Sequence, residues 1–161
     1  MTDLDERFMR RALELASTAA DLGEVPVGAV IVLDGEIVAE AYNRRETDKN
    51  ALAHAETLAI GSACKKLGGW RLHKCDLYVT LEPCPMCAGA IVNARIRRVM
   101  IGAKDAKAGA FGSLFNFNFY PLNHRPQVEF GVCEREASEL LQIFFKNLRT
   151  RRENDKNTNK Y

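Results

Sequence analysis

Apolar residues recur at helical spacing near both ends of the chain. The spacing predicts a helix over Asp3 to Asp21 and a second helix from Cys133 or Glu134 to about Arg152. The apolar side of the first helix comprises Leu4, Phe8, Ala12, Leu15 and Ala19. The apolar side of the last helix comprises Leu140, Leu141, Phe144, Phe145 and Leu148. We expect the first helix to belong to the scaffold of the fold.

The pattern becomes strand-like between residues 27 and 42. β-Branched residues dominate Val27–Leu33, and a second arm follows at Glu36–Tyr42. Asp34 and Gly35 separate the two arms, and both residue types tolerate the positive φ angles of a tight turn. We therefore predict a β-hairpin, followed by a polar connector over residues 44–50.

Helical and strand-like segments alternate through the rest of the chain. Helices are expected over 54–67 and from residue 84 onward, and strands at 76–81, 98–101 and 127–131. Residues 104–126 are expected to form a loop that is rich in aromatic residues. These could stack on unpaired bases, contact a second copy or pack on the fold, and we favour packing or a dimer contact. This order indicates an α/β fold: a mixed sheet of five strands with helices on both faces, which makes three layers.

The length of 161 residues, with a mass of 18.0 kDa, is that of a single domain. We assign residues 1–152 to this domain and expect the polar residues 153–161 to form a disordered tail. The net charge of +2 is too small to indicate nucleic-acid binding by itself, so any basic surface must be local. The chain has no apolar run near 18 residues and no signal peptide, so we expect a cytoplasmic protein without a membrane span.

Two of the five cysteines are spaced for metal binding. Cys84 and Cys87 lie three residues apart at the start of an expected helix, so both sulfur atoms face the same side. Together with His54 they offer two thiolates and an imidazole, ligands that suit one Zn²⁺ ion in a tetrahedral site. Three protein ligands leave the fourth position to water, as in catalytic zinc sites, where the metal lowers the pKa of that water toward ~7. The other three, Cys64, Cys75 and Cys133, are expected to be reduced packing residues.

Glu56 follows the histidine by two residues, and we expect it to be the catalytic proton carrier and not a ligand. Residues i and i+2 of a regular helix point to opposite sides. His54 and Glu56 therefore reach one metal only if His54 stands at the helix N-terminus. We infer that two helix N-termini, near His54 and Cys84, are directed at one site, where their partial positive charge favours thiolate and hydroxide. The simpler alternative for Glu56 is a surface carboxylate at a helix N-terminus.

The motifs resemble those of zinc-dependent nucleoside and nucleobase deaminases in the cytidine deaminase superfamily. The wider match, over about residues 5–152, resembles the bacterial tRNA-specific adenosine deaminases. It includes 24–30, Asn43, 53–56, 77–84, 102–109, 112–114 and 123–125. The resemblance implies a cytidine-deaminase-like fold, a homodimer and the hydrolytic conversion of adenosine to inosine at the wobble position of a tRNA anticodon stem-loop. In that reaction zinc-bound hydroxide attacks C6, Glu56 moves protons and ammonia leaves.

The same resemblance implies roles for residues whose ordinary interpretation is less specific. Asn43 would hydrogen-bond the flipped nucleoside, although an asparagine after a strand is commonly a turn residue. Asp105 and Lys107 would contact ribose and phosphate, although loop charges are commonly only solvated. Phe145 and Arg149 would contact RNA, although cations are also favoured at a helix C-terminus without any partner.

Two alternatives remain open on the sequence. The first is a free-base guanine or cytosine deaminase, because such enzymes share the same core motifs. The second is a non-catalytic zinc-containing RNA-binding module, against which an intact Glu56 and the missing fourth ligand argue. The Asp105–Lys107 loop and the basic last helix favour RNA over a free base.

Overall fold

The computed structural model describes residues 2–158, which form four α-helices and five strands. The elements follow the chain in the order α1 (Asp3–Asp21), β1 (Gly28–Leu33), β2 (Glu36–Tyr42), α2 (Ala55–Leu67), β3 (Asp76–Leu81), α3 (Pro85–Ala94), β4 (Arg98–Ala103), the 3₁₀ turn η1 (Phe117–Phe119), β5 (Gln127–Phe130) and α4 (Glu134–Thr158). The expected hairpin is confirmed, with Asp34 and Gly35 at φ angles of 51° and 82° in its turn. None of these helices combines the length and the apolar character needed to cross a bilayer.

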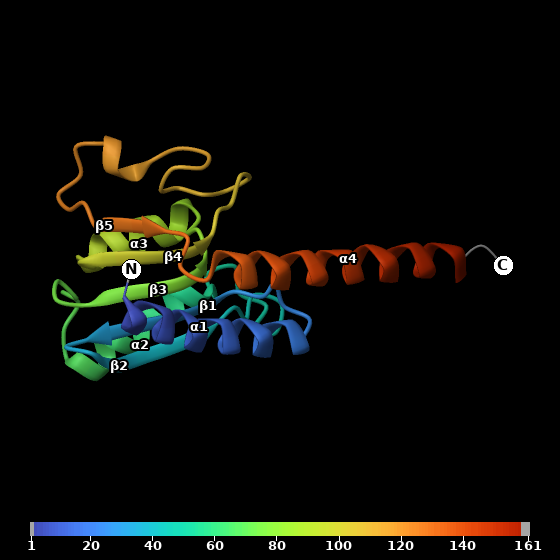
Figure 1. Ribbon diagram of the computed structural model, residues 1–161, viewed down its shortest axis with the longest axis horizontal. Helices are drawn as coiled ribbons and strands as arrows, with labels where there is room; N and C mark the ends of the chain where they lie inside the picture. The colour runs from blue at the N-terminus through green and yellow to red at the C-terminus, as the bar shows by residue number, and fades with distance from the viewer. Residues whose placement is uncertain (1, 159–161) are drawn as a thin grey trace.

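The five strands form one mixed sheet in the order β2-β1-β3-β4-β5. β1 is antiparallel to both of its neighbours, whereas β3, β4 and β5 run parallel to one another. Each of the two parallel connections crosses over through residues outside the sheet, as parallel pairing requires. The helices α2 and α3 cover one face, and α1 and α4 cover the other (Figure 1). The predicted three-layer α/β/α fold is therefore confirmed.

Alternation along the strands divides the core into two halves. On β1, Ala29 and Ile31 face α2 and α3, whereas Val30 and Val32 face α1. This two-residue period follows from the opposite directions of successive side chains in a strand. At Gly28 the backbone of α1 comes so close that a Cβ atom would stand 2.0 Å from the Ala12 carbonyl oxygen.

A polar contact fixes the beginning of α1 to the sheet. The Tyr78 hydroxyl donates to Asp5 Oδ1 at 2.8 Å, and Asp5 also completes a capping box with Thr2. Burial alone would raise the pKa of Asp5, but the hydrogen bonds from Tyr78 and Thr2 outweigh burial, and the pKa of this carboxyl lies below its ordinary value. Asp5 is therefore a buried carboxylate that is stable in its charged form.

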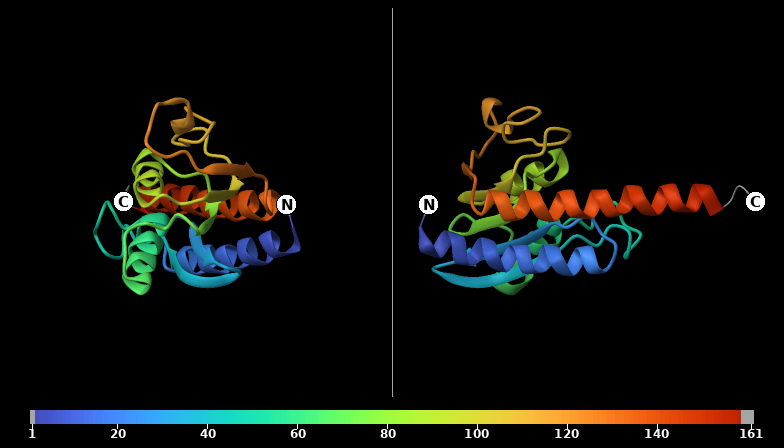
Figure 2. Two further views of the ribbon diagram at one scale, coloured as in Figure 1. Left: turned by 90° about the vertical axis from the view of Figure 1, so that its left-hand side faces the viewer. Right: turned by 45° about the vertical axis from the view of Figure 1, so that its right-hand side comes forward.

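The last helix differs from the expectation. α4 continues through residues 153–158, and only 159–161 of the expected tail lie outside the described residues. This stretch contains no glycine or proline that would end a helix, and opposite charges stand four residues apart at Arg149 and Glu153. The final turns of α4 extend away from the body of the molecule as a rod (Figures 1 and 2).

The aromatic side chains of the loop over residues 104–126 are divided between the core and the surface. Phe111 is buried, and Phe115 and Phe117 pack against the core cluster under α2 and α3, as the packing interpretation predicts. Phe119 and Tyr120 are instead exposed, with 85% and 54% of their surface accessible. The loop therefore extends the core and also presents two aromatic rings to solvent.

Candidate active site

Two helix N-termini meet at the end of the sheet where β3 ends. His54 is the N-cap of α2 and Cys84 is the N-cap of α3, and both have extended backbone angles. Neither side chain caps its own helix, so both are free to turn toward the space between the helices. Pro85 occupies the first turn of α3, where its fixed φ suits a helix start, and Cys87 follows within the same turn.

The three donor atoms are arranged as a metal site requires. His54 Nδ1 lies 3.7 Å from Cys84 Sγ and 3.5 Å from Cys87 Sγ. A tetrahedral zinc with bonds of about 2.0 Å to nitrogen and 2.3 Å to sulfur places such atoms about 3.5 Å apart. Within the described residues this is the one group of histidine, cysteine and carboxylate atoms close enough to share an ion. The donor set and its spacing fit a single metal ion.

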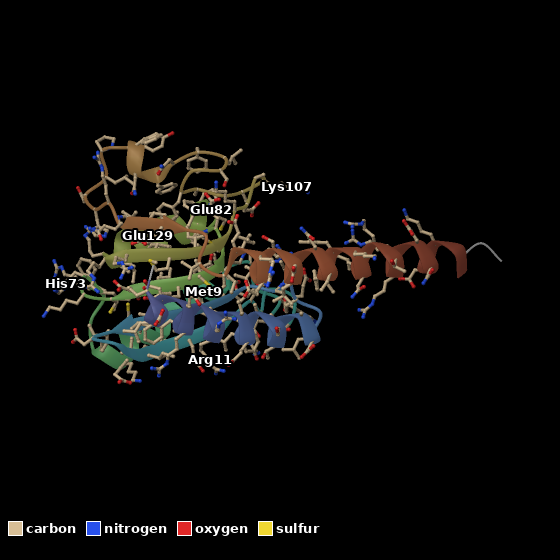
Figure 3. All side chains as sticks on the ribbon, in the orientation of Figure 1. Met9, Arg11, His73, Glu82, Lys107 and Glu129 are labelled. Carbon is tan, nitrogen blue, oxygen red and sulfur yellow. The ribbon has the colours of Figure 1, made fainter. Side chains whose placement is uncertain are left out.

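The other two histidines give no fourth ligand. His124 Nε2 lies 2.6 Å from the Ile96 carbonyl oxygen, which holds its ring at the connection between α3 and β4. His73 lies at the opposite end of the sheet from Glu82, a residue of the pocket wall (Figure 3). The site therefore has three protein donors among the described residues and an open side, which is the arrangement of catalytic metal sites.

The electrostatics of the triad favour a thiolate even without a metal. A hydrogen bond from the Cys87 thiol lowers the pKa of Cys84 to about 4, against the effect of burial and with further help from His54. The same hydrogen bond and burial raise the pKa of Cys87. Two helix N-termini add positive potential at these atoms. Cys84 is therefore a thiolate at neutral pH, which is the form of cysteine that binds metal ions.

Glu56 forms the buried carboxyl of the site. Its side chain is 4% exposed, and it lies in the first turn of α2, two residues after His54. Burial raises the pKa of Glu56 to about 7. A carboxyl that exchanges its proton near neutral pH is suited to general acid–base chemistry. The N-cap position of His54 is the geometry that lets residues i and i+2 face one site.

A pocket opens over the triad, and several predicted residues line it. Asn43, His54, Glu56, Cys84 and Asp105 belong to its walls. Asn43 donates through Nδ2 to the Val25 carbonyl oxygen and accepts from the Arg45 backbone through Oδ1, so it is both a turn residue and a wall residue. An amide nitrogen has two N–H groups, which leaves Asn43 one donor for a ligand.

Lys107 lies outside this pocket, beside a second depression that we call the α4 groove. The α4 groove is lined by Val25, Leu81, Lys104, Asp105, Ala106, Lys107, Leu141, Gln142, Phe145 and Arg149. It shares Val25, Leu81 and Asp105 with the pocket, so the two are continuous. The structure thus places the predicted RNA-contacting residues on one path that leads from the metal triad to the side of α4.

Sequence reasoning missed part of the pocket wall. Val25 and Val27 line the pocket from the segment before β1, and Arg45 and Ala108 line it from two loops. Glu82 is a further missed residue of the wall. A charged residue at the end of a buried strand, two positions before Cys84, is the signal that could have identified Glu82.

Comparison with known protein families defines the class. The family model of the MafB19-like deaminases matches residues 4–149. The match includes the elements that carry the triad and Glu56. A deaminase is therefore the class of protein that the fold and the site define.

Individual relatives narrow this class. A Bacillus subtilis protein named tRNA-specific adenosine deaminase is 50% identical over 149 residues, which are 92% of either chain. A solved structure from a study of A-to-I editing by tRNA:A34 deaminases has a TM-score of 0.82 and 48% identity, over 84% of this chain and 99% of that one. A Bacillus subtilis guanine deaminase has a TM-score of 0.61 and 37% identity, over 76% of this chain and 88% of that one. The chain belongs to the family of tRNA-specific adenosine deaminases.

Proposed function

We propose that this protein hydrolytically deaminates adenosine to inosine at the wobble position of a tRNA anticodon loop. The observation that carries the proposal is the triad of His54, Cys84 and Cys87 with a buried carboxyl, Glu56, in a pocket that continues into the α4 groove. The names of the relatives support the same reaction and the same substrate. An adenine in a loop is already unpaired, so it leaves its neighbours at low cost to enter a deep pocket.

The cofactor we propose is one Zn²⁺ per subunit, held by His54, Cys84 and Cys87. Imidazole and thiolate donors at these distances suit zinc better than the oxygen-preferring Mg²⁺ or Ca²⁺. When bound, zinc supplies the Lewis acidity that makes water a nucleophile near neutral pH.

Glu56 carries protons between the reacting groups. It accepts a proton from the attacking water and delivers it to the adenine ring, and a second transfer lets the amino group at C6 leave as ammonia. A pKa near 7 suits both directions of transfer, because either form of the carboxyl is then populated. Asn43, which is 7% exposed, orients the nucleoside through its remaining N–H group.

The α4 groove binds the RNA around the target. Lys107 and Arg149 place two cations on it, and both suit phosphate groups. Phe145 is 40% exposed, and we propose that it stacks with an unpaired base. Asp105 stands where the pocket and the α4 groove meet, and we propose that it contacts the ribose of the target.

We further propose that the protein is a homodimer in the cytoplasm. On α3, Met86, Gly89 and Ala90 are only partly buried in the monomer. Small and apolar residues on a helix permit close approach of a second chain. A reducing compartment would also keep the Cys84 and Cys87 ligands available for metal.

The proposal is tested by a deamination assay on zinc-loaded protein. One set of reactions contains an anticodon stem-loop with adenosine at the wobble position, and the other contains free guanine, cytosine and adenosine. We expect inosine in the stem-loop and no turnover of free bases. Turnover of a free base with an untouched stem-loop would establish the free-base alternative, in line with the 37% identity to a guanine deaminase. No turnover in either set, with zinc bound, would favour a non-catalytic RNA-binding module.

A further inference from the structure

Glu82 is a buried carboxylate that the proposed reaction does not use. It follows the last residue of β3 and precedes Cys84 by two positions, and only 2% of its surface is exposed. In Figure 3 it lies at the same end of the sheet as Lys107. A buried charge requires compensating hydrogen bonds, so its partners show what it does.

All hydrogen-bond partners of the Glu82 carboxylate come from one loop. Oε1 accepts from the backbone N–H groups of Phe111 at 3.0 Å and Ser113 at 3.1 Å. Oε2 accepts from the backbone N–H of Asp105 at 3.1 Å and from the Ser113 hydroxyl. These four bonds use the acceptor sites of both carboxylate oxygens. Glu82 therefore has no capacity left for a substrate, and its role lies in the loop that surrounds it.

The loop is shaped around this carboxylate. A Cβ atom on Gly109 would stand 2.3 Å from both Cδ and Oε2 of Glu82, and 2.6 Å from the Asp105 carbonyl oxygen. Only glycine permits the backbone to lie this close to the carboxylate. The Ala110 N–H also donates to the Pro83 carbonyl oxygen at 2.9 Å, which adds a contact to the segment that leads into Cys84.

This loop carries one wall of the pocket. Asp105 and Ala108 line the pocket directly. Asp105 Oδ1 accepts from the backbone N–H groups of Lys107 and Ala108 at 2.9 and 3.1 Å, so the conformation of the whole turn depends on the position of Asp105. Glu82 holds the Asp105 backbone from one side, and the residues of the turn are arranged around the Asp105 side chain on the other.

We propose that Glu82 is a positioning residue for substrate binding, which fixes residues 105–113 so that Asp105 and Ala108 form a pre-organised wall against the target nucleoside. The inference rests on the proposed function for its substrate. It explains why a carboxylate is buried beside the metal triad without being a ligand or a proton carrier. Pre-organisation of this kind lowers the cost of ordering the site when the substrate binds.

The test is Glu82→Gln, which keeps the shape of the side chain but replaces one acceptor oxygen with an NH₂ donor. That donor would face N–H and O–H groups of the loop, so two of the four bonds would be lost. We expect kcat/KM for the stem-loop to fall on the order of 10- to 100-fold, mainly through KM, with zinc content unchanged. Amide exchange at Asp105, Phe111 and Ser113 should become about tenfold faster or more, because their acceptor is weakened.

Asp76→Asn provides the matched control. Asp76 is a buried carboxylate at the other end of β3, where Arg97 donates to it at 2.8 and 2.9 Å. This change removes a buried charge from the same strand without touching the pocket, so KM and the exchange of the three loop amides should stay at wild-type values. A rise of KM in Asp76→Asn equal to that in Glu82→Gln would overturn the proposal, because it would reveal a general loss of stability.

Ser113→Ala keeps the test decisive if Glu82→Gln fails to fold or loses zinc. It removes one of the four bonds and leaves the carboxylate in place, and we expect about a threefold rise of KM with faster exchange at Asp105 and Phe111. If amide exchange at Asp105 and Phe111 becomes faster in Ser113→Ala while KM stays at the wild-type value, the positioning role is overturned. The exchange measurement needs no substrate. A wild-type protein that deaminates no RNA would therefore refute the proposed function separately from the role of Glu82 in ordering the loop.

Discussion

Substitution of Gly28 by alanine should separate α1 from the sheet. The added Cβ would stand 2.0 Å from the Ala12 carbonyl oxygen and 2.8 Å from the Ala16 nitrogen. Both atoms belong to the helix backbone, so no side-chain rotation relieves the contact. To restore an ordinary distance of about 3.4 Å, α1 must withdraw by about 1.4 Å, and a gap of that size removes much of the dispersion contact across the interface.

The expected cost is large for a single methyl group. Overpacking in a core typically costs about 1–3 kcal/mol, and we expect the upper end or more because a whole helix must shift. Phe8 and Met9 would both lose contact with the sheet. A loss of about 3 kcal/mol is a large fraction of the 5–15 kcal/mol that typically stabilises a domain. The pocket should also be affected, because Val27 lines it one residue before Gly28.

Urea unfolding followed by circular dichroism measures this loss. With a slope of about 2 kcal/mol per molar urea, the midpoint should fall by about 1.5 M. Gly61→Ala in α2 is the control: a Cβ there meets nothing within 4 Å, and alanine should raise stability by up to about 1 kcal/mol. A Gly28→Ala midpoint equal to that of wild type or of the control would refute the close approach of α1 and β1.

Three further predictions concern the carboxyl of Glu56, the buried carboxylate of Asp5 and the cation of Arg149. Glu56→Gln should lower kcat by about 10³- to 10⁴-fold while zinc content and KM stay near wild type, and a kcat within tenfold of wild type would exclude Glu56 as proton carrier. The lowered pKa of Asp5 stabilises the fold above the pKa of about 3.9 expected in the unfolded chain, and this contribution is lost as the pH falls through the folded value. Urea midpoints at pH 7 and pH 3 should therefore differ more in wild type than in Asp5→Asn; equal differences would contradict this linkage. Arg149→Ala should weaken stem-loop binding and reduce by about 1 the slope of the logarithm of the binding constant against the logarithm of the salt concentration. Arg135→Ala, at the exposed start of α4, should change neither the affinity nor this slope. Identical slopes in the wild type and both variants would show that Arg149 does not contact the RNA.

Local chemistry was enough to predict most elements of the fold. The Asp34-Gly35 turn needs positive φ at two adjacent positions, so its residue types alone identify the hairpin. The two-residue spacing of His54 and Glu56 required a helix that begins at His54, and α2 begins at that point. In each case the constraint acts within a few residues of the chain.

Features that depend on distant parts of the chain could not be predicted in this way. The strand order and the antiparallel pairing of β1 with β3 join segments about 50 residues apart, and hydrophobic alternation does not specify such partners. The role of Glu82 depends on a loop that returns from more than 20 residues away. The helical continuation over residues 153–158 has another cause: polar composition alone does not distinguish a disordered tail from an exposed helix, and no glycine or proline there ends α4.

The two N-cap ligands also have a consequence for the integrity of the protein. His54 and Cys84 are 30 residues apart in the chain, and between them run all of α2 and β3. A metal held by both would join the two ends of this segment in the folded chain, whereas in the unfolded chain the same ligands are far apart and hold it weakly. Closing a loop of that length costs roughly 4 kcal/mol of chain entropy, and folding has already met this cost before the metal binds. Loss of the metal would then destabilise the fold, so the supply of the metal would affect how much folded protein persists as well as how much is active.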